Sequence, residues 1–304
     1  MNKKILVLMG GISAEREISI LSGKACVKAL RKKNYNVSTL DPKGNFIHEI
    51  RKIKPSIVFN ALHGRFGEDG YVQSILESEK IKYTHSGALA SSLAIDKEIS
   101  KKIFISKKIN TPRFLVYQNN KNKNIHSLIK KSKINFPIVI KPINEGSSIG
   151  VYICSKSNIN KNLKRLKKYD RILVEKYIPG REIQVAVRNS SVLGAIELKP
   201  KRKFYDYYAK YSDKAKTKHI MPAKLSKKKY KEVLAIAKKA HNSLGCKGIT
   251  RSDFRFHNDK FYLLEVNTQP GMTSLSLVPE IADYKGIKFE DLVEWMVKDA
   301  SCNR

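Results

Sequence analysis

Cysteine is scarce in this chain of 304 residues. The four cysteines, Cys26, Cys154, Cys246 and Cys302, lie far apart, and none belongs to a C-x-x-C pair. Disulfide frameworks and cysteine-based zinc sites both need cysteines at short, regular spacings. The sequence therefore argues against both kinds of site, and it fits the reducing environment of the cytoplasm.

Long apolar runs are also missing. Near the N-terminus, Lys3 and Lys4 precede the apolar run Ile5–Met9, which Gly10 and Gly11 then interrupt. The hydrophobic part of a secretory signal has roughly 7–15 residues, and a membrane-spanning helix needs about 20. We expect a cytoplasmic protein with neither a signal peptide nor a membrane partner.

Acidic residues are few relative to basic ones. The chain has 27 Asp and Glu against 60 Lys and Arg, which gives a formal net charge of +33. Such an excess is typical of proteins that bind nucleic acids or membrane surfaces. Here, however, the lysines are spread through nearly every segment. We therefore expect a solvated basic surface without a dedicated nucleic-acid partner, whose field speeds the arrival of anionic substrates.

Residues 1–96 alternate the patterns of strands and helices. Strands are predicted at Lys4–Met9, Asn36–Leu40 and Ser56–Leu62, with helical stretches after each. Ser13 is expected to cap the first helix. This order predicts a parallel sheet with helices on its faces, a Rossmann-like α/β domain. Ligands bind beyond the carboxyl ends of such strands, where the polar loops 10–15 and 63–70 lie.

The remainder of the chain has the pattern of two α+β units. Residues 97–182 combine helices with short strands, and residues 183–304 combine paired strands, a long helix and a hairpin over 249–267. The polar loop 199–219 interrupts the last unit, and loops of this length in compact proteins are usually functional. We expect three domains, at 1–96, 97–182 and 183–304.

The hairpin over 249–267 bears two acidic side chains. Glu265 and Asn267 are two residues apart on one strand, so they share a face. A three-residue loop would place Asp253 of the other strand opposite Glu265, whereas a two-residue loop would turn Asp253 to the other face. Clustered oxygen ligands suit a hard cation such as Mg²⁺. Spacing alone leaves a metal site and an ordinary charged strand face both open.

Two polar loops have more than one interpretation. The segment Gly146–Gly150 follows Lys141 closely in the sequence, and it does not match the Walker A motif. Its backbone N–H groups could bind a phosphate, or the segment could form a simple hairpin turn. Residues 199–211 mix lysines with tyrosines, which suits single-stranded nucleic acid or a mobile lid. His63 stands alone, and a histidine with satisfied hydrogen bonds at a strand end is its default interpretation.

Five motifs follow one another along nearly the whole chain. They are Gly10-Gly11-x-Ser13-x-Glu15-Arg16-Glu17-x-Ser19, His63-Gly64-x-x-Gly67-Glu68-Asp69-Gly70, Glu145-Gly146-Ser147-Ser148-x-Gly150-Val151, Phe204-Tyr205-Asp206-Tyr207-x-Ala209-Lys210-Tyr211, and the block from Arg251-x-Asp253 through Glu265-x-Asn267 to Pro279. In this order they resemble the D-alanine–D-alanine ligase family of the ATP-grasp superfamily. The resemblance implies a three-domain ATP-grasp architecture with ATP held between the central and C-terminal domains. It also implies that ATP activates one D-alanine as an acyl phosphate, which a second D-alanine attacks, for peptidoglycan synthesis.

The resemblance implies a role for each matching position. Nucleotide-binding positions would be Lys97, Lys141, Glu175, Lys176, Ile178, Glu182 and Lys210. Two Mg²⁺ ions, replaceable by Mn²⁺, would bind Asp253, Glu265 and Asn267. The first D-alanine would meet Glu15 and His63, and the second would meet Ser276 and Leu277. Catalytic roles would belong to Glu15, Ser147, Tyr211, Arg251 and Gly271.

Two alternatives remain beside this expectation. An ATP-grasp ligase could take D-serine or D-lactate as its second substrate, although Tyr211, which relatives that use D-lactate lack, favours an amine. A basic nucleic-acid-binding protein that uses residues 199–211 is the alternative from another functional class. The relatives implied by the resemblance are commonly homodimers through the N-terminal domain, so a homodimer is expected.

Overall fold

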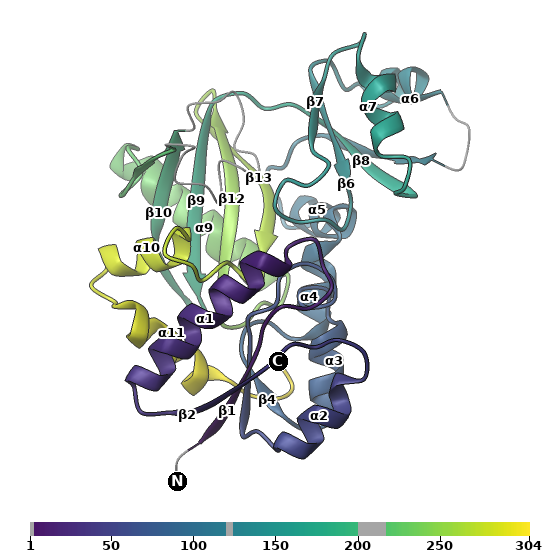
Figure 1. Ribbon diagram of the computed structural model, residues 1–304. Helices are drawn as coiled ribbons and strands as arrows, with labels where there is room; N and C mark the ends of the chain where they lie inside the picture. Colours follow the sequence, from purple (N-terminus) through teal and green to yellow (C-terminus); the bar gives the residue numbers. More distant parts are fainter. Residues whose placement is uncertain (1–2, 120–123, 200–216) are drawn as a thin grey trace.

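The computed structural model describes residues 3–119, 124–199 and 217–304, and these residues form three sheets in consecutive parts of the chain (Figure 1). Figure 1 shows the N-terminal sheet at the bottom, the C-terminal sheet at the upper left and the central sheet at the upper right. The expected combination of α/β and α+β parts is confirmed. Within the described ranges, no helix is both long and apolar enough to cross a membrane.

The N-terminal sheet is parallel, as the alternating strand and helix patterns predict. Its strands lie in the order β2-β1-β3-β4, and each adjacent pair is parallel. The elements of this part are β1 (Lys4–Leu8), α1 (Arg16–Lys32), β2 (Asn36–Leu40), α2 (Phe46–Ile53), β3 (Ile57–Asn60), α3 (Tyr71–Ser78), β4 (Lys82–Tyr83) and α4 (Ala88–Ile95). Strands β1 and β3 are continuous apolar runs because both of their faces are covered.

The loop after β1 differs from its prediction. Helix α1 begins at Arg16, and Glu15 rather than Ser13 occupies the N-cap position. The Ser13 hydroxyl instead donates a hydrogen bond to the carbonyl oxygen of His63 (2.6 Å) and accepts one from the Glu15 N–H (3.1 Å). The expectation that Ser13 caps the helix is wrong, because its hydroxyl joins the two loops that follow β1 and β3.

The central sheet is antiparallel and lies in the order β5-β8-β6-β7. Its part of the chain contains α5 (Lys97–Ser106), β5 (Phe114–Gln118), α6 (Ile125–Lys131), β6 (Ile138–Pro142), β7 (Tyr152–Cys154), α7 (Ile159–Arg165) and β8 (Arg171–Lys176). Ile129 of α6 and Leu163 of α7 join Ile140 and Val174 of the sheet in one apolar cluster. This sheet therefore has a core of its own.

The C-terminal sheet is antiparallel and lies in the order β11-β10-β9-β12-β13. Its part contains β9 (Arg181–Arg188), β10 (Ser191–Lys199), β11 (Lys218–Ile220), α9 (Lys227–Ser243), β12 (Ile249–His257), β13 (Lys260–Asn267), α10 (Leu277–Tyr284) and α11 (Phe289–Asp299). Helix α10 was not expected from the sequence. Pro279 lies in its first turn, where a proline removes no helical hydrogen bond.

In the hairpin of β12 and β13, Asp253 pairs with Glu265 as considered above, but the turn is shorter and the register shifts once along the strands. Its turn has two residues, Asn258 and Asp259, with φ of 45° and 57°, as the tight hairpin turn requires. Such a turn alone would pair Asp253 with Leu264, and the three-residue loop considered above is wrong. A shift in register next to Asp253 skips Leu264 and places Asp253 opposite Glu265 after all.

The N-terminal and C-terminal parts share an apolar core. Val7 of β1 and Leu30 of α1 belong to the same buried cluster as Val293 of α11. On the surface, Lys32 of α1 pairs with Glu290 of α11 at 2.7 Å. Figure 1 shows α1 lying alongside α11 and below the C-terminal sheet. The N-terminal and C-terminal parts therefore pack together through one apolar core, whereas the central sheet packs around a separate one.

Two buried histidines predict how stability depends on pH. Burial lowers the pKa of His85 to about 3 and that of His241 to about 4. The unfolded chain binds these protons below about pH 6.5, whereas the folded chain does not. The free energy of unfolding should therefore fall as the pH drops from about 6.5 toward 4, by up to about 1.4 kcal/mol per pH unit for each histidine.

The variant His85→Gly isolates one of these two contributions. His85 has φ of 70°, a conformation that glycine adopts without strain. Urea unfolding at about pH 7 and about pH 5 should show a smaller loss of stability for the variant than for the parent. An equal loss in both proteins would contradict the assignment to His85.

Candidate active site

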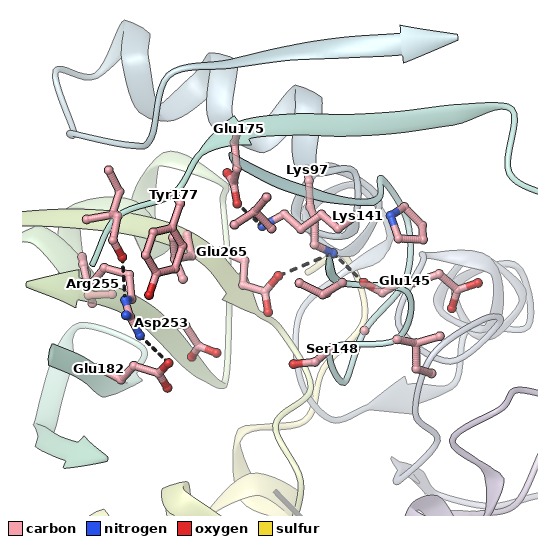
Figure 2. Close-up of a pocket in the computed structure, with 18 of the residues that line it drawn as sticks. Lys97, Lys141, Glu145, Ser148, Glu175, Tyr177, Glu182, Asp253, Arg255 and Glu265 are labelled. Carbon is pink, nitrogen blue, oxygen red and sulfur yellow. Dashed lines mark hydrogen bonds and ion pairs between the residues drawn. The ribbon is translucent and has the colours of Figure 1, made fainter. Parts of the chain in front are cut away.

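Two adjoining cavities lie where the three parts of the chain meet. The large cavity, about 870 Å³, opens between the central and C-terminal sheets (Figure 2). The small cavity, about 630 Å³, continues toward the N-terminal part. The two cavities share Lys97, Glu145, Gly146 and Glu265 in their walls.

Most of the site residues expected from the sequence border these cavities. Those that line the large cavity are Lys97, Lys141, Glu175, Lys176, Ile178, Glu182, Asp253 and Glu265. Those that line the small cavity are Glu15, His63, Lys97, Ser147, Arg251, Glu265, Asn267 and Gly271. Residues from all three parts of the chain are thus brought to one continuous space.

Lys141 and Glu175 form a buried charged pair in the large cavity. Lys141 Nζ lies 2.6 Å from Glu175 Oε1, and Glu175 is 3% exposed. Burial would raise the pKa of Glu175, but Lys101 and Lys141 hold it below its usual value. Burial would lower the pKa of Lys141, but Glu175, Glu265 and Asp253 raise it. Lys141 therefore stays charged and can attract an anion.

The other wall of the large cavity contains a second ion pair. Arg255 donates hydrogen bonds to the Glu182 carboxylate and, at 3.0 Å, to the Ile178 carbonyl oxygen. Figure 2 shows Arg255 and Glu182 together on the side of the cavity away from Lys97. The Lys176 ammonium donates to the carbonyl oxygen of Asn135 (3.1 Å). Arg255 thus fixes the orientation of the Glu182 carboxylate.

Asp253, Glu265 and Asn267 lie on the hairpin face that borders both cavities. Glu265 Oε2 is 3.5 Å from Lys97 Nζ, as Figure 2 shows. Arg251 holds Asp253 with two hydrogen bonds, from Nε (2.8 Å) and Nη2 (3.0 Å). The Asn267 side-chain oxygen accepts a bond from a backbone N–H two residues later (2.8 Å). The structure therefore brings the expected trio together.

The donor set of this trio decides what kind of ion would suit it. Among the described residues, no group of three or more His, Cys, Asp or Glu side chains could hold a metal ion. The trio consists of two carboxylates and one amide. A divalent ion here would need further oxygens from water or a phosphate-bearing ligand, which is how Mg²⁺ is usually bound. The residues fit such an ion and do not fit a closed structural site.

The small cavity contains a buried carboxylate. Glu15 is 5% exposed, and the Ser147 hydroxyl donates a hydrogen bond to it. Ser147 lies in the loop between β6 and β7, so this bond joins the central part to the start of α1. A Cβ atom at Gly146 would lie 2.9 Å from Glu15 Oε2, so the glycine leaves room for this close approach. Glu15 can pair with a cationic ligand group.

His63 has hydrogen-bond partners at both ring nitrogens. Its Nδ1 lies 3.0 Å from Glu68 Oε1, and its Nε2 lies 3.1 Å from Ser22 Oγ. Ser22 Oγ in turn accepts a bond from the N–H of Met272 (3.2 Å). The satisfied histidine expected as the default is therefore present, and it also borders the small cavity.

Two expected substrate-binding residues lie behind the cavity wall. Gly271 lines the small cavity, but Ser276 and Leu277 are not among the described residues that line either cavity. Ser276 Oγ accepts the N–H of Thr273 (2.9 Å), and the Leu277 side chain is 5% exposed in the shared core. A Cβ on Gly271 would lie 2.9 Å from Ser276 Oγ, so Ser276 directly adjoins the wall.

Sequence reasoning missed three charged residues: Glu68 and Arg255, which line the cavities, and Lys101, which pairs with Glu175. Spacing could have indicated two of them. Lys101 follows Lys97 by four residues on a helix, and Arg255 follows Asp253 by two on a strand, so each shares a side with its partner. Glu68 belongs to a motif quoted above, but its contact with a histidine depends on the fold.

Two expected residues lie outside the described part of the chain. Lys210 and Tyr211 belong to residues 200–216, for which the structure gives no description. The expected lid over 199–219 therefore stays a prediction. Its flanks are described, since β10 ends at Lys199 and β11 begins at Lys218.

The chain is similar to known proteins over nearly its whole length. The family described as "D-ala D-ala ligase C-terminus" matches residues 103–298. The D-alanine–D-alanine ligase of Pelagibacter ubique (strain HTCC1062) is 61% identical to this chain, and the match covers 100% of both proteins. The D-alanine–D-alanine ligase of Wolbachia pipientis wMel is 48% identical, and the match covers 97% of this chain and 94% of that relative. A solved D-alanine–D-alanine ligase from Bacillus anthracis, complexed with ATP, has a TM-score of 0.86 at 29% identity and covers 98% of this chain and 97% of that chain. The chain therefore belongs to the D-alanine–D-alanine ligase family.

Proposed function

We propose that this chain uses ATP to join two molecules of D-alanine into D-alanyl-D-alanine for peptidoglycan synthesis. The observation that carries the proposal is the wall shared by the two cavities, which includes Lys97 and Glu265. A nucleotide in the large cavity can present its terminal phosphate there to a small amino acid in the small cavity. Holding two reactants next to each other in this way supplies much of the rate of phosphoryl transfer.

Mass spectrometry of the products tests this function. After incubation with ATP, Mg²⁺ and D-alanine we expect D-alanyl-D-alanine, ADP and phosphate, and none of them when L-alanine replaces D-alanine. Offering D-serine or D-lactate together with D-alanine tests the second substrate. A mixed product that dominates near neutral pH would refute D-alanine in that role.

The large cavity suits the parts of a nucleotide. Lys97 and Lys141 would hold the α- and β-phosphates, because both ammonium groups border the cavity. Glu182, oriented by its arginine partner, would accept the ribose hydroxyls. The backbone of residues 176–178 would meet the edge of the adenine ring. Glu175 would accept the adenine amino group with a carboxylate that two lysines already bind.

The trio Asp253, Glu265 and Asn267 would supply oxygen ligands for two Mg²⁺ ions, with Mn²⁺ able to replace them. When bound, such ions neutralise the charge that develops on the phosphates during transfer. The chain's own contribution is to keep three oxygen donors on one face of a hairpin. Arg251 holds the first of them, and Lys97 lies beside the second.

In the small cavity, Glu15 would bind the ammonium group of the first D-alanine, next to His63. The carboxylate of that D-alanine would then face the shared wall. One of its oxygens attacks the γ-phosphorus, the bond to ADP breaks, and an acyl phosphate forms. Burial of Glu15 strengthens the pairing with an ammonium group, because water screens it less.

The second D-alanine would attack the acyl phosphate with its neutral amine. The attack forms the C–N bond and a tetrahedral oxyanion, which Arg251 and the N–H of Gly271 would stabilise. The oxyanion collapses with release of phosphate, and the amine proton passes to solvent or to the phosphate. Ser276 and Leu277 would bind the carboxylate of this second D-alanine, from just behind the wall of the small cavity.

The loop 199–219 would close over both cavities. Lys210 would reach the γ-phosphate, and Tyr211 would join the pair formed by Glu15 and Ser147. Closure would keep water away from the acyl phosphate. We also propose that the protein works in the cytoplasm as a homodimer through its N-terminal part, without a dedicated nucleic-acid or membrane partner.

The variant Ser147→Ala tests the first subsite. Loss of the hydroxyl that donates to Glu15 should raise the KM for D-alanine roughly tenfold, with a smaller change in kcat. Steady-state kinetics with saturating ATP measure both constants. Ser155→Ala is the matched control, since Ser155 lies on the surface beside Ser157. Equal KM values in the two variants would argue against a role of Ser147 in this subsite.

A further inference from the structure

Lys101 is a fully buried lysine that the proposed function does not use. It lies one turn after Lys97 on α5, with its side chain 0% exposed. Its Nζ is 2.8 Å from Glu175 Oε2, donates a hydrogen bond to the Thr111 hydroxyl (2.6 Å) and lies 5.6 Å from the centre of the Phe114 ring. Lys101 is not among the described residues that line either cavity, so a ligand there would not touch it.

Glu175 is shared by two lysines. Its Oε2 faces Lys101 and its Oε1 faces Lys141, which borders the large cavity. An ammonium group without access to water is costly, and burial lowers the pKa of Lys101 to about 8 although Glu175 opposes this change. One carboxylate balances one of the two ammonium groups. The three groups together therefore keep a net positive charge beneath the cavity.

We propose that Lys101 is a positioning residue of the nucleotide site, which occupies one oxygen of Glu175 so that Lys141 remains available to the nucleotide phosphates. The inference rests on the proposed function, because it assumes that the large cavity holds a nucleotide. Without Lys101, Glu175 and Lys141 would form a buried pair of zero net charge. Attraction between unlike charges is strong in such surroundings, so Lys141 would be held by Glu175 and would attract phosphate less.

A role in folding alone predicts a different outcome. If Lys101 only helped α5 to pack against β5 and β8, its removal would lower stability and leave the folded protein's nucleotide affinity unchanged. If it positions Glu175, its removal weakens nucleotide binding in the folded protein. Removing the negative charge of Glu175 as well would leave Lys141 without its carboxylate partner. The net positive charge of this group would then be restored, and nucleotide affinity would recover.

The experiment compares Lys101→Met with Lys102→Met. Methionine keeps the length of the side chain and removes the charge. Lys102 is the matched control because its side chain is 65% exposed and pairs with Glu98 on the helix surface. Titration calorimetry with ADP in magnesium buffer should show roughly tenfold weaker binding for Lys101→Met and no change for Lys102→Met. In steady state, the KM for ATP should rise by a similar factor, with kcat changed by less.

The double variant Lys101→Met/Glu175→Gln distinguishes a positioning role of Lys101 from a role in folding alone, because only the positioning role predicts a recovery of ADP affinity. Glutamine keeps an oxygen that can accept the adenine amino group and removes only the negative charge. The double variant should therefore bind ADP more tightly than Lys101→Met and recover most of the lost affinity. ADP affinity equal to the parent in Lys101→Met, or a double variant weaker than the single one, would overturn the inference. Either result leaves the proposed function standing as long as the parent makes D-alanyl-D-alanine, so the two failures can be told apart.

If Lys101→Met does not unfold cooperatively, Thr111→Val replaces it. This variant keeps the shape of the side chain and removes one acceptor of the Lys101 ammonium group. It should weaken ADP binding by a few-fold, which supports the inference. Unchanged binding in a folded Thr111→Val protein counts against it.

Discussion

Replacing Glu265 by glutamine is expected to lower kcat by about 10²-fold or more, with the protein still folded. Glu265 faces Asp253 across the hairpin, and its carboxylate lies 3.5 Å from Lys97 in the wall between the two cavities. The amide has the same shape but no charge, so it binds a divalent ion more weakly. Neutralisation of the transferred phosphate would then be lost where charge develops.

Rates of D-alanyl-D-alanine formation over a series of Mg²⁺ concentrations measure this effect. Glu290→Gln is the matched control, since Glu290 pairs with Lys32 on the surface of α11 and is not among the described residues that line either cavity. The control should keep the parent's kcat. A near-normal rate for Glu265→Gln at saturating Mg²⁺ would contradict the assignment of Glu265 to a metal site.

Replacing Arg251 by lysine is expected to lower kcat by about 10²–10³-fold. Arg251 borders the small cavity and binds both oxygens of Asp253 through its planar fork. Lysine keeps the positive charge but cannot make two parallel hydrogen bonds from one plane. The variant would therefore lose both the donor proposed for the oxyanion and the fixed orientation of a metal-binding carboxylate.

The control for this variant is Arg113→Lys, because Arg113 lies at the surface and donates to the backbone carbonyl of Lys133. Rapid-quench measurements can separate acyl phosphate formation from the later attack of the amine. Arg251→Lys should slow both steps. A variant in which only substrate binding changes would show that Arg251 does not stabilise the transition state.

Much of the fold could be predicted from the sequence, because strands such as β1, β3 and β6 are short, largely apolar runs. The strand at Asn36–Leu40 has the predicted bounds, and the parallel order follows from the alternation with helices. Helix α5 ends at Ser106, and Lys108 two residues later has a positive φ of 55°. Such a helix end is set by local backbone geometry, which composition does not reveal.

The site was predictable as a set of motifs and less so as a set of contacts. Glu15 and Ser147 are far apart in the sequence, and their hydrogen bond depends on how the central part meets α1. Lys101 has no motif of its own, and its contacts with Glu175 of β8 and Phe114 of β5 depend on the fold. Ser276 belongs to the last of the five motifs, yet the structure places it next to Gly271 and not among the described residues that line the small cavity.

The shift in register at Leu264 divides strand β13 into two stretches with opposite phase. Before it, Phe261 and Leu263 point into the core; after it, the inward position passes to Val266. With an unbroken alternation, Glu265 would share the core face of Leu263. One apolar residue without any reactive group thus decides which way a carboxylate points: the first stretch of β13 packs the core, and Glu265 of the second borders the cavities.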